Sequence, residues 1–93
     1  MKLDLNCYIK NLEGVEDKNA HLGKIIGNAL FMKATGLEPI KAVSWARSFY
    51  NNEKVEIDKN EAVKLIDCIK NDGNLPVAVK AEAEIIIIDT MNK

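Results

Sequence analysis

The chain has 93 residues, a formal net charge of -1 at neutral pH, and a composition of 47% hydrophobic and 29% charged residues. This length predicts one domain over residues 1–93, and the hydrophobic content is well above that of disordered chains. The balanced charge, with Arg47 as the only arginine, excludes a strong positive field for nucleic acid, and no apolar run approaches the roughly 18 residues of a membrane span.

Residues 1–18 are expected to be extended. Leu3 and Leu5 alternate with polar residues, which is the period-two pattern of a strand, and a turn-like stretch follows at residues 11–14. The segment is therefore predicted to form a short β-hairpin or an extended arm. Because an isolated hairpin is marginal in water, it has to pack on the helical body of residues 19–93 or on a partner.

The first helix is predicted over residues 20–35. Asn19 has the side chain of a good N-cap, and Gly36 is placed where a glycine commonly ends a helix. Apolar residues recur at helical spacing and predict the buried stripe of this helix. The stripe consists of Leu22, Ile25, Ile26, Ala29, Leu30 and Met32.

Two glycines, Gly23 and Gly27, lie four residues apart within this helix. Each costs about 1 kcal/mol relative to alanine in a helix interior, so some compensating contact is expected. We interpret the pair as a place where another backbone or an aromatic ring approaches closely, with Trp45 or Phe49 as the expected neighbour. The spacing does not match a phosphate-binding loop, and no strand is predicted directly before it.

The second helix is predicted over residues 39–51. Pro39 suits the first helical position, where its missing N–H is harmless, and the pair Asn51-Asn52 closes the segment. Residues 53–57 alternate in polarity and are expected to form a short extended linker. The apolar stripe of the helix is predicted to contain Ile40, Val43, Ala46 and either Phe49 or Tyr50.

The third helix has the clearest start signal of the chain. Asp58 is followed three residues later by Glu61, which is an Asp-led form of the capping box, and Asp72-Gly73 ends the segment. Its predicted buried stripe contains Ala62, Leu65, Ile66 and Ile69.

The last segment opens at Leu75-Pro76 and leaves two alternatives. Four consecutive isoleucines, residues 85–88, would cover every side of a helix, and their β-branching favours a strand over residues 82–90. The proline start and the alanine- and glutamate-rich approach favour a helix instead. In a helix, one face is shared by Val77, Ala78, Ala81, Ile85 and Ile88.

Residues with catalytic or metal-binding chemistry are few. His21 is the only histidine, and its place near a predicted helix start favours a capping or surface role. Cys7 and Cys68 lack the spacing of a redox or zinc motif, so free thiols in a reducing, cytoplasmic setting are expected, with a disulfide as the alternative. No catalytic residue, no metal site and no cofactor is predicted, and the chain is expected not to be an enzyme.

The partner-binding residues predicted from the sequence lie in two segments. Trp45, Arg47 and Tyr50 belong to the densest aromatic stretch, which predicts a protein-binding patch, a surface that stacks on nucleic-acid bases, or simply core anchors. Ile86 and Ile87 belong to the isoleucine run, which predicts self-association because one domain face cannot bury all four side chains.

Several short motifs follow one another along the chain. They are the Asp4-Leu5-Asn6 arm, the Leu12-Glu13-Gly14 turn, the glycine-containing segment 22–30, the Lys41, Ala42 and Ala46 helix, the Val55-Glu56-Ile57-Asp58 start and the Leu75-Pro76 opening. Their order resembles small helical proteins encoded by phages and prophages. The resemblance implies an intracellular protein of a phage or mobile element that acts through protein contacts, and it carries no catalytic residues.

The sequence thus predicts a mainly α fold: a compact domain of three to four helices with a short N-terminal β-hairpin or extended arm. The expected function is that of a non-enzymatic protein-interaction module, a phage or mobile-element accessory or assembly protein that self-associates as a homo-oligomer. The alternative is a small DNA-binding regulator of helix-turn-helix type, against which the acidic balance weighs.

Overall fold

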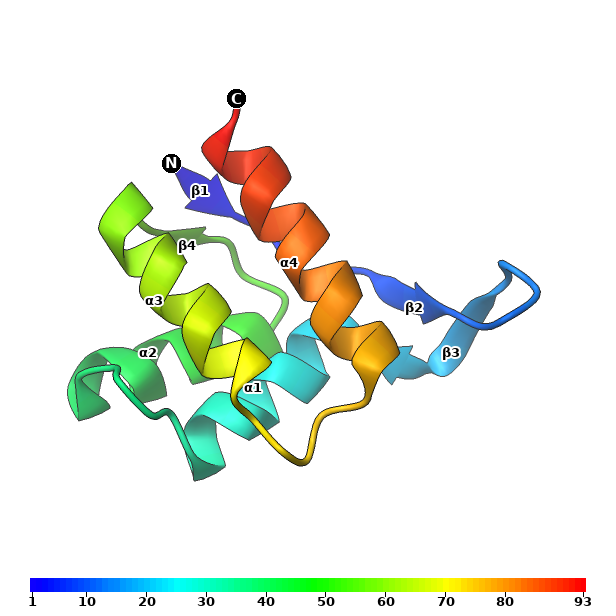
Figure 1. Cartoon of the computed structure of the whole chain (residues 1–93), viewed down its shortest axis with the longest axis horizontal. Coiled ribbons are helices and arrows are strands. Elements are labelled where there is room, and N and C mark those ends of the chain that lie inside the picture. Colours follow the sequence, from blue (N-terminus) through cyan, green and yellow to red (C-terminus); the bar gives the residue numbers. More distant parts are fainter.

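A computed structural model describes the whole chain, residues 1–93. Four helices pack together with two small antiparallel sheets of two strands each, so the fold is α plus β (Figure 1). The predicted N-terminal hairpin is consistent with this arrangement. The expected helical body over residues 19–93 needs correction, because strands from that region take part in both sheets.

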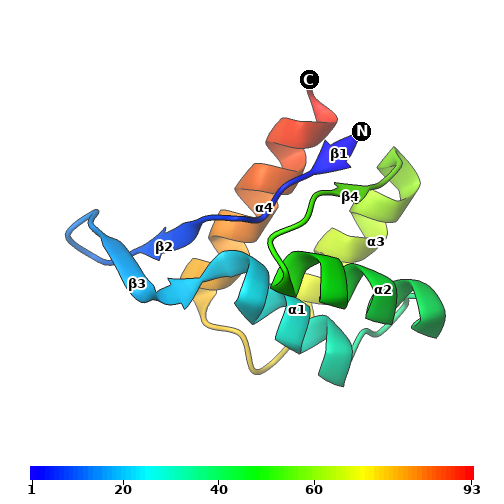
Figure 2. The ribbon, with the colours of Figure 1, turned by 180° about the vertical axis from the view of Figure 1, so that it is seen from behind.

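The first sheet joins the N-terminus to the middle of the chain. Strand β1 (Lys2–Leu3) pairs antiparallel with β4 (Val55–Glu56), and the two lie side by side in Figure 2. The N-terminal ammonium group donates to the carbonyl oxygen of Ile57 at 3.2 Å. Two residues of the segment predicted as an extended linker, Val55 and Glu56, therefore form a strand. Its partner strand lies too far away in sequence for local patterns to reveal it.

The second sheet is the β-hairpin formed by β2 (Tyr8–Lys10) and β3 (Glu16–His21). Its base is attached to the body, because Ile9 is buried and the N–H of Leu22 donates to the carbonyl of Cys7 at 2.8 Å. Its tip projects away from the helices (Figure 1). The strand continues beyond the predicted limit of residue 18 and delays the start of the first helix.

Helix α1 (Leu22–Met32) is shorter at both ends than predicted. Its N-cap is His21, whose ring nitrogen accepts the N–H of Lys24, and not Asn19, which lies within β3. Gly36 does not end the helix either. It lies in the following turn with φ of +85°, a conformation that glycine adopts without strain.

Helix α2 (Pro39–Tyr50) begins at the predicted proline. Helix α3 (Lys59–Lys70) begins with the predicted capping box, in which the Asp58 side chain accepts the N–H of Glu61 and the Glu61 side chain accepts the N–H of Asp58. Both boundaries follow from short-range chemistry, which explains why the sequence locates them to within a residue.

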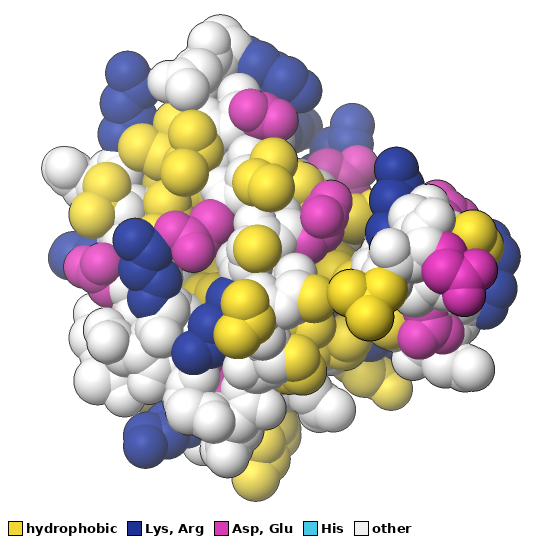
Figure 3. Space-filling view, turned by 45° about the vertical axis from the view of Figure 1, so that its right-hand side comes forward, with side chains coloured by type: hydrophobic (Ala, Val, Ile, Leu, Met, Phe, Trp, Pro, Cys, Tyr) yellow, Lys and Arg dark blue, Asp and Glu magenta, His cyan; other side chains and the backbone are white.

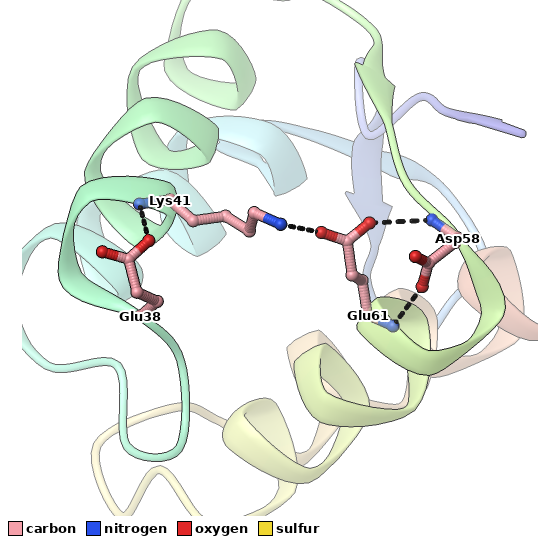
Figure 4. A network of polar contacts seen from close by, with 4 residues as sticks. All are labelled: Glu38, Lys41, Asp58 and Glu61. Atoms are coloured by element: carbon pink, nitrogen blue, oxygen red, sulfur yellow. Dashed lines mark hydrogen bonds and ion pairs between the residues drawn. The ribbon is translucent and has the colours of Figure 1, made fainter.

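A chain of polar contacts joins the beginnings of α2 and α3 (Figure 4). The Lys41 ammonium group pairs with one carboxylate oxygen of Glu61, whose other oxygen accepts the N–H of Asp58 at 3.0 Å. The hydrogen bond with Lys41 lowers the pKa of Glu61, and the same bond raises the pKa of Lys41. Because Lys41 is about half exposed, the pair positions the two helices more than it stabilises them.

Helix α4 (Val77–Met91) resolves the ambiguity over residues 82–90, which are helical. It packs beside α3 and across the first sheet (Figure 1). Its core face consists of Val79, Ala83 and Ile87. The face predicted from the periodicity, which contains Val77, Ala81, Ile85 and Ile88, points the other way and is exposed.

The core is one cluster of 18 buried residues drawn from both sheets and all four helices. Several expected core residues lie outside it: Met32 and Ile40 are each 80% exposed. Trp45 and Ala42, which the periodicity did not select, are buried instead. In α1 and α2, the buried face is rotated about the helix axis by about one residue relative to the face that periodicity predicts. A short helix has too few apolar residues for periodicity to reveal such a rotation.

The two glycines of α1 lie against the backbone of α2. A Cβ atom at Gly23 would be 2.7 Å from the carbonyl oxygen of Phe49, and one at Gly27 would be 2.7 Å from that of Ala46. Both distances are shorter than real Cβ contacts, so only glycine permits this approach. The predicted close contact is confirmed, and the neighbour is the α2 backbone and not an aromatic ring.

Candidate functional site

The fold brings no cluster of metal-ligating side chains together. No group of three or more His, Cys, Asp or Glu side chains lies close enough to hold a metal ion. The surface of the fold carries two apolar regions, one over α1 and α2 and one along α4. The β2–β3 hairpin also projects from the surface.

The single histidine links the hairpin to α1. His21 Nδ1 accepts the N–H of Lys24 at 3.2 Å, so the proton of the neutral ring is on Nε2, which donates to Asn6 Oδ1 at 2.9 Å. The Tyr8 ring packs edge-on against the imidazole, with ring centroids 5.2 Å apart. Burial lowers the pKa of His21, and the nearby Lys24 ammonium group lowers it further. The predicted capping role is confirmed.

Acidification is expected to destabilise the protein through His21. Because the folded state lowers the pKa of His21 below its ordinary value of 6.5, the unfolded chain binds the proton more readily. The free energy of unfolding should therefore fall as the pH drops below 6.5, until the folded histidine is itself protonated. Urea denaturation between pH 7.5 and 5 measures this loss.

A His21→Asn variant is the control for this pH dependence. Asparagine is a good N-cap residue and does not titrate, so the variant should lose the part of the pH dependence that His21 causes. An unchanged pH profile in the variant would assign the effect to the carboxylates instead.

Both cysteines are free thiols. Burial raises the pKa of the Cys7 thiol, and the carboxylates of Glu82, Asp4 and Glu16 raise it further. Burial also raises the pKa of Cys68, as does Asp72. A reactive cysteine requires a lowered pKa, so neither thiol has the electrostatic setting of a nucleophile.

The five residues predicted to bind a partner have different positions in the fold. Trp45 and Ile87 are 6% and 1% exposed, so their side chains belong to the core and are not available to a partner. Ile86 is half-buried. Arg47 and Tyr50 are exposed and line the same depression. The core-anchor alternative is thus correct for Trp45. Arg47 and Tyr50 are accessible at the surface, and partner binding through them stays a prediction.

That depression is a groove between α1 and α2, with a volume of about 170 Å³. Its floor is made by Gly27 and Ala46, where the two backbones approach and no large side chain fills the surface. Phe31, 55% exposed, and Tyr50, 47% exposed, form its apolar sides. We call this depression the α1–α2 groove. Phe31 falls outside the apolar stripe predicted for this helix, and no motif of the sequence indicates a role for it.

The positive charge beside the groove has no acidic counterpart. Arg47 lines it, and its guanidinium group makes no hydrogen bond or ion pair within the chain. The Lys24 ammonium group donates to the carbonyl oxygen of Tyr50 at 3.1 Å and lies 4.3 Å from the centre of its ring. No Asp or Glu lines the groove. A ligand with a carboxylate is therefore better matched to it than a cationic one.

The second apolar region is the outward face of α4. Val77 is 82% exposed, Ile85 54% and Ile88 44%, and Ala81 is exposed between them. These four residues, which we call the α4 stripe, recur every three or four positions and run along the helix on one side. Figure 3 shows hydrophobic side chains over this face of the molecule, with acidic side chains between them.

Comparison of the chain with protein-family models gives no match, and no curated protein or solved structure resembles it at a significant level. None of the four helices combines the length and the apolar character that crossing a bilayer requires. Function is therefore inferred from the geometry of the surfaces described above.

Proposed function

We propose that the protein is a non-enzymatic protein-interaction module that forms a homodimer through the α4 stripe. The observation that carries the proposal is that α4 has two apolar faces. The inner face, with Val79, Ala83 and Ile87, packs in the core, while the outer face leaves two isoleucines about half exposed. An exposed apolar stripe along a whole helix is typical of an interface between proteins.

The spacing of the stripe favours a second copy of the same chain as the partner. If two α4 helices pack antiparallel about a two-fold axis, Val77 of one copy lies opposite Ile88 of the other, and Ala81 lies opposite Ile85. The small side chain of Ala81 then faces the larger side chain of Ile85, which favours interdigitating helix packing. The stripe is thus complementary to itself.

Charges beside the stripe fit the same pairing. Lys80 and Glu84 lie on one flank of α4, where the Lys80 ammonium group donates to the carbonyl oxygen of Lys70 at 3.0 Å. The two-fold axis would bring Lys80 of one copy near Glu84 of the other. Within one chain, the Lys70 ammonium group already pairs with Glu84 at 3.2 Å. Such exposed pairs add little energy, but they favour the antiparallel register over a slipped one.

We expect the protein to sediment as a dimer at a few micromolar, with about twice the 10.4 kDa mass of the chain. Ile88→Glu should convert it to a monomer, because the substitution places a charge at the seam in both copies. The control is Ile40→Glu, which introduces the same charge at an exposed helical isoleucine outside α4. Monomeric wild-type protein, or equal dissociation by both variants, would contradict the proposal.

The alternative of a helix-turn-helix regulator receives less support from the geometry. The helices are joined by residues 33–38, 51–58 and 71–76, which are longer connections than the three- or four-residue turn of that motif. A phage-type accessory or assembly role, as the resemblance implies, is compatible with a small self-associating module and belongs to the same proposal.

A further inference from the structure

We propose that the tip of the β2–β3 hairpin of one copy docks into the α1–α2 groove of a second copy, so that the chain also associates head to tail. The contact involves no residue of α4 and is independent of the homodimer proposed above. It rests on two features of the fold that have no role within a single copy: an organised tip that touches nothing and a groove that nothing fills.

The tip presents an apolar side chain to solvent. Leu12 is 108% exposed, and Val15 beside it is 59% exposed. The hairpin stands out from the body, as the ribbon and the surface both show (Figures 1 and 3). A fully exposed leucine at the end of a projecting element offers its whole apolar surface for burial in an interface.

The backbone of the tip is held in one conformation. Asn11 Oδ1 accepts the N–H groups of Glu13 at 3.0 Å and Val15 at 3.1 Å, and the N–H of Gly14 donates to the Asn11 carbonyl at 2.9 Å. Gly14 has φ of +82°, which glycine adopts without strain. Leu12 is thus displayed in a preorganised turn, which reduces the entropy lost on docking.

The groove has the size and lining for such a side chain. Its volume of about 170 Å³ is well below the roughly 300 Å³ or more of sites for small-molecule ligands, and suits a single large apolar side chain. Phe31 and Tyr50 provide apolar sides, and Gly27 and Ala46 provide a floor. We therefore place Leu12 between the two aromatic rings.

The charges of the two surfaces are complementary. Glu13 follows Leu12 at the tip and makes no ion pair within the chain. Arg47 lines the groove, is likewise unpaired, and has a guanidinium group suited to a carboxylate. Lys18 beside the tip is already paired with Glu16 at 3.2 Å, and Glu13 is the only charged residue of the turn at residues 11–15.

A head-to-tail contact uses different surfaces on the two copies, so each copy keeps a free tip or a free groove. Such contacts extend into chains or close into rings. Together with a two-fold α4 contact, they would give the protein two independent ways to assemble. In the wild-type protein, species larger than a dimer are therefore expected at high concentration.

The test is made in the Ile88→Glu background, which removes the α4 contact. At several hundred micromolar, this variant should still show a concentration-dependent rise in weight-average mass. Leu12→Ser, at the tip, and Arg47→Glu, in the groove, should each weaken this association about tenfold or more. Val63→Ser and Lys64→Glu, which likewise replace an apolar side chain by serine and a cation by glutamate, alter exposed positions of α3 and should leave the association unchanged.

Mixing separates a head-to-tail contact from any symmetric one. Leu12→Ser protein keeps an intact groove, and Arg47→Glu protein keeps an intact tip, so an equimolar mixture should form a 1:1 dimer that neither protein forms alone. Exchanging the charges in one chain, as Glu13→Arg with Arg47→Glu, should restore association. A background variant that stays monomeric, or a mixture that fails to associate, overturns the inference and leaves the α4 proposal untouched.

Discussion

Replacement of Gly27 by alanine is expected to lower the free energy of unfolding by about 1–3 kcal/mol, the usual cost of overpacking. The added methyl group would lie 2.7 Å from the carbonyl oxygen of Ala46 and 3.2 Å from the backbone nitrogen of Tyr50. Because both atoms belong to the backbone of α2, they move only if the helices separate. Gly23→Ala should behave in the same way, since its methyl group meets the carbonyl oxygens of Phe49 and Leu5.

Gly73→Ala is the matched control for this experiment. A Cβ atom at Gly73 would meet nothing within 4 Å, and its φ is not in the left-handed region. The control variant should therefore be unchanged or slightly more stable, by up to about 1 kcal/mol, through reduced entropy of the unfolded chain. Midpoints of urea denaturation at constant m-value measure all three variants. Stabilisation of Gly27→Ala would contradict the close approach of the two helices.

Ile87→Ala is expected to cost about 2–5 kcal/mol of stability, whereas Ile88→Ala should cost no more than about 0.5 kcal/mol. The two residues are adjacent and chemically identical. Ile87 is 1% exposed in the core, however, and Ile88 is 44% exposed on the α4 stripe. Truncation of Ile87 leaves a cavity, and truncation of Ile88 removes a group that water already reaches.

These measurements should be made at submicromolar protein, because dimerisation through α4 would otherwise add its own free energy to the apparent stability. The fluorescence of the buried Trp45 reports unfolding at that concentration. If Ile87→Ala does not fold, Ile87→Val should still show a loss of about 0.5–1.5 kcal/mol. Equal effects at Ile87 and Ile88 would mean that the outer face of α4 is also buried.

The parts of the fold that the sequence predicts well are those set by neighbouring residues. The capping box of Asp58 and Glu61 locates α3, Pro39 locates α2, and the glycine pair of α1 indicates a close approach of another element. For the two helix starts, the signal and its structural consequence lie within a few residues. For the glycine pair only the signal lies within one helix, and the sequence does not identify the α2 backbone as the neighbour. The sequence predicts only part of the candidate site, because it indicates Arg47 and Tyr50 but not Phe31 or Leu12.

The parts that the sequence leaves open depend on partners that are distant along the chain. Residues 53–57 look like a linker because β1, the strand with which Val55–Glu56 pairs, lies at the opposite end of the sequence. Likewise, His21 replaces Asn19 as the cap of α1 because Asn6 and the hairpin bring the imidazole to that position.

Helix α4 shows most clearly which features the sequence determines and which the tertiary structure decides. The run of four consecutive isoleucines by itself predicts that one small domain cannot bury all four side chains. Only the packing of α4 against α3 and the first sheet decided that Ile87 lies inside while Ile85 and Ile88 lie outside. An apolar residue on every side of a helix supplies no preferred direction, so the rotation of the helix is set by the surface that it covers.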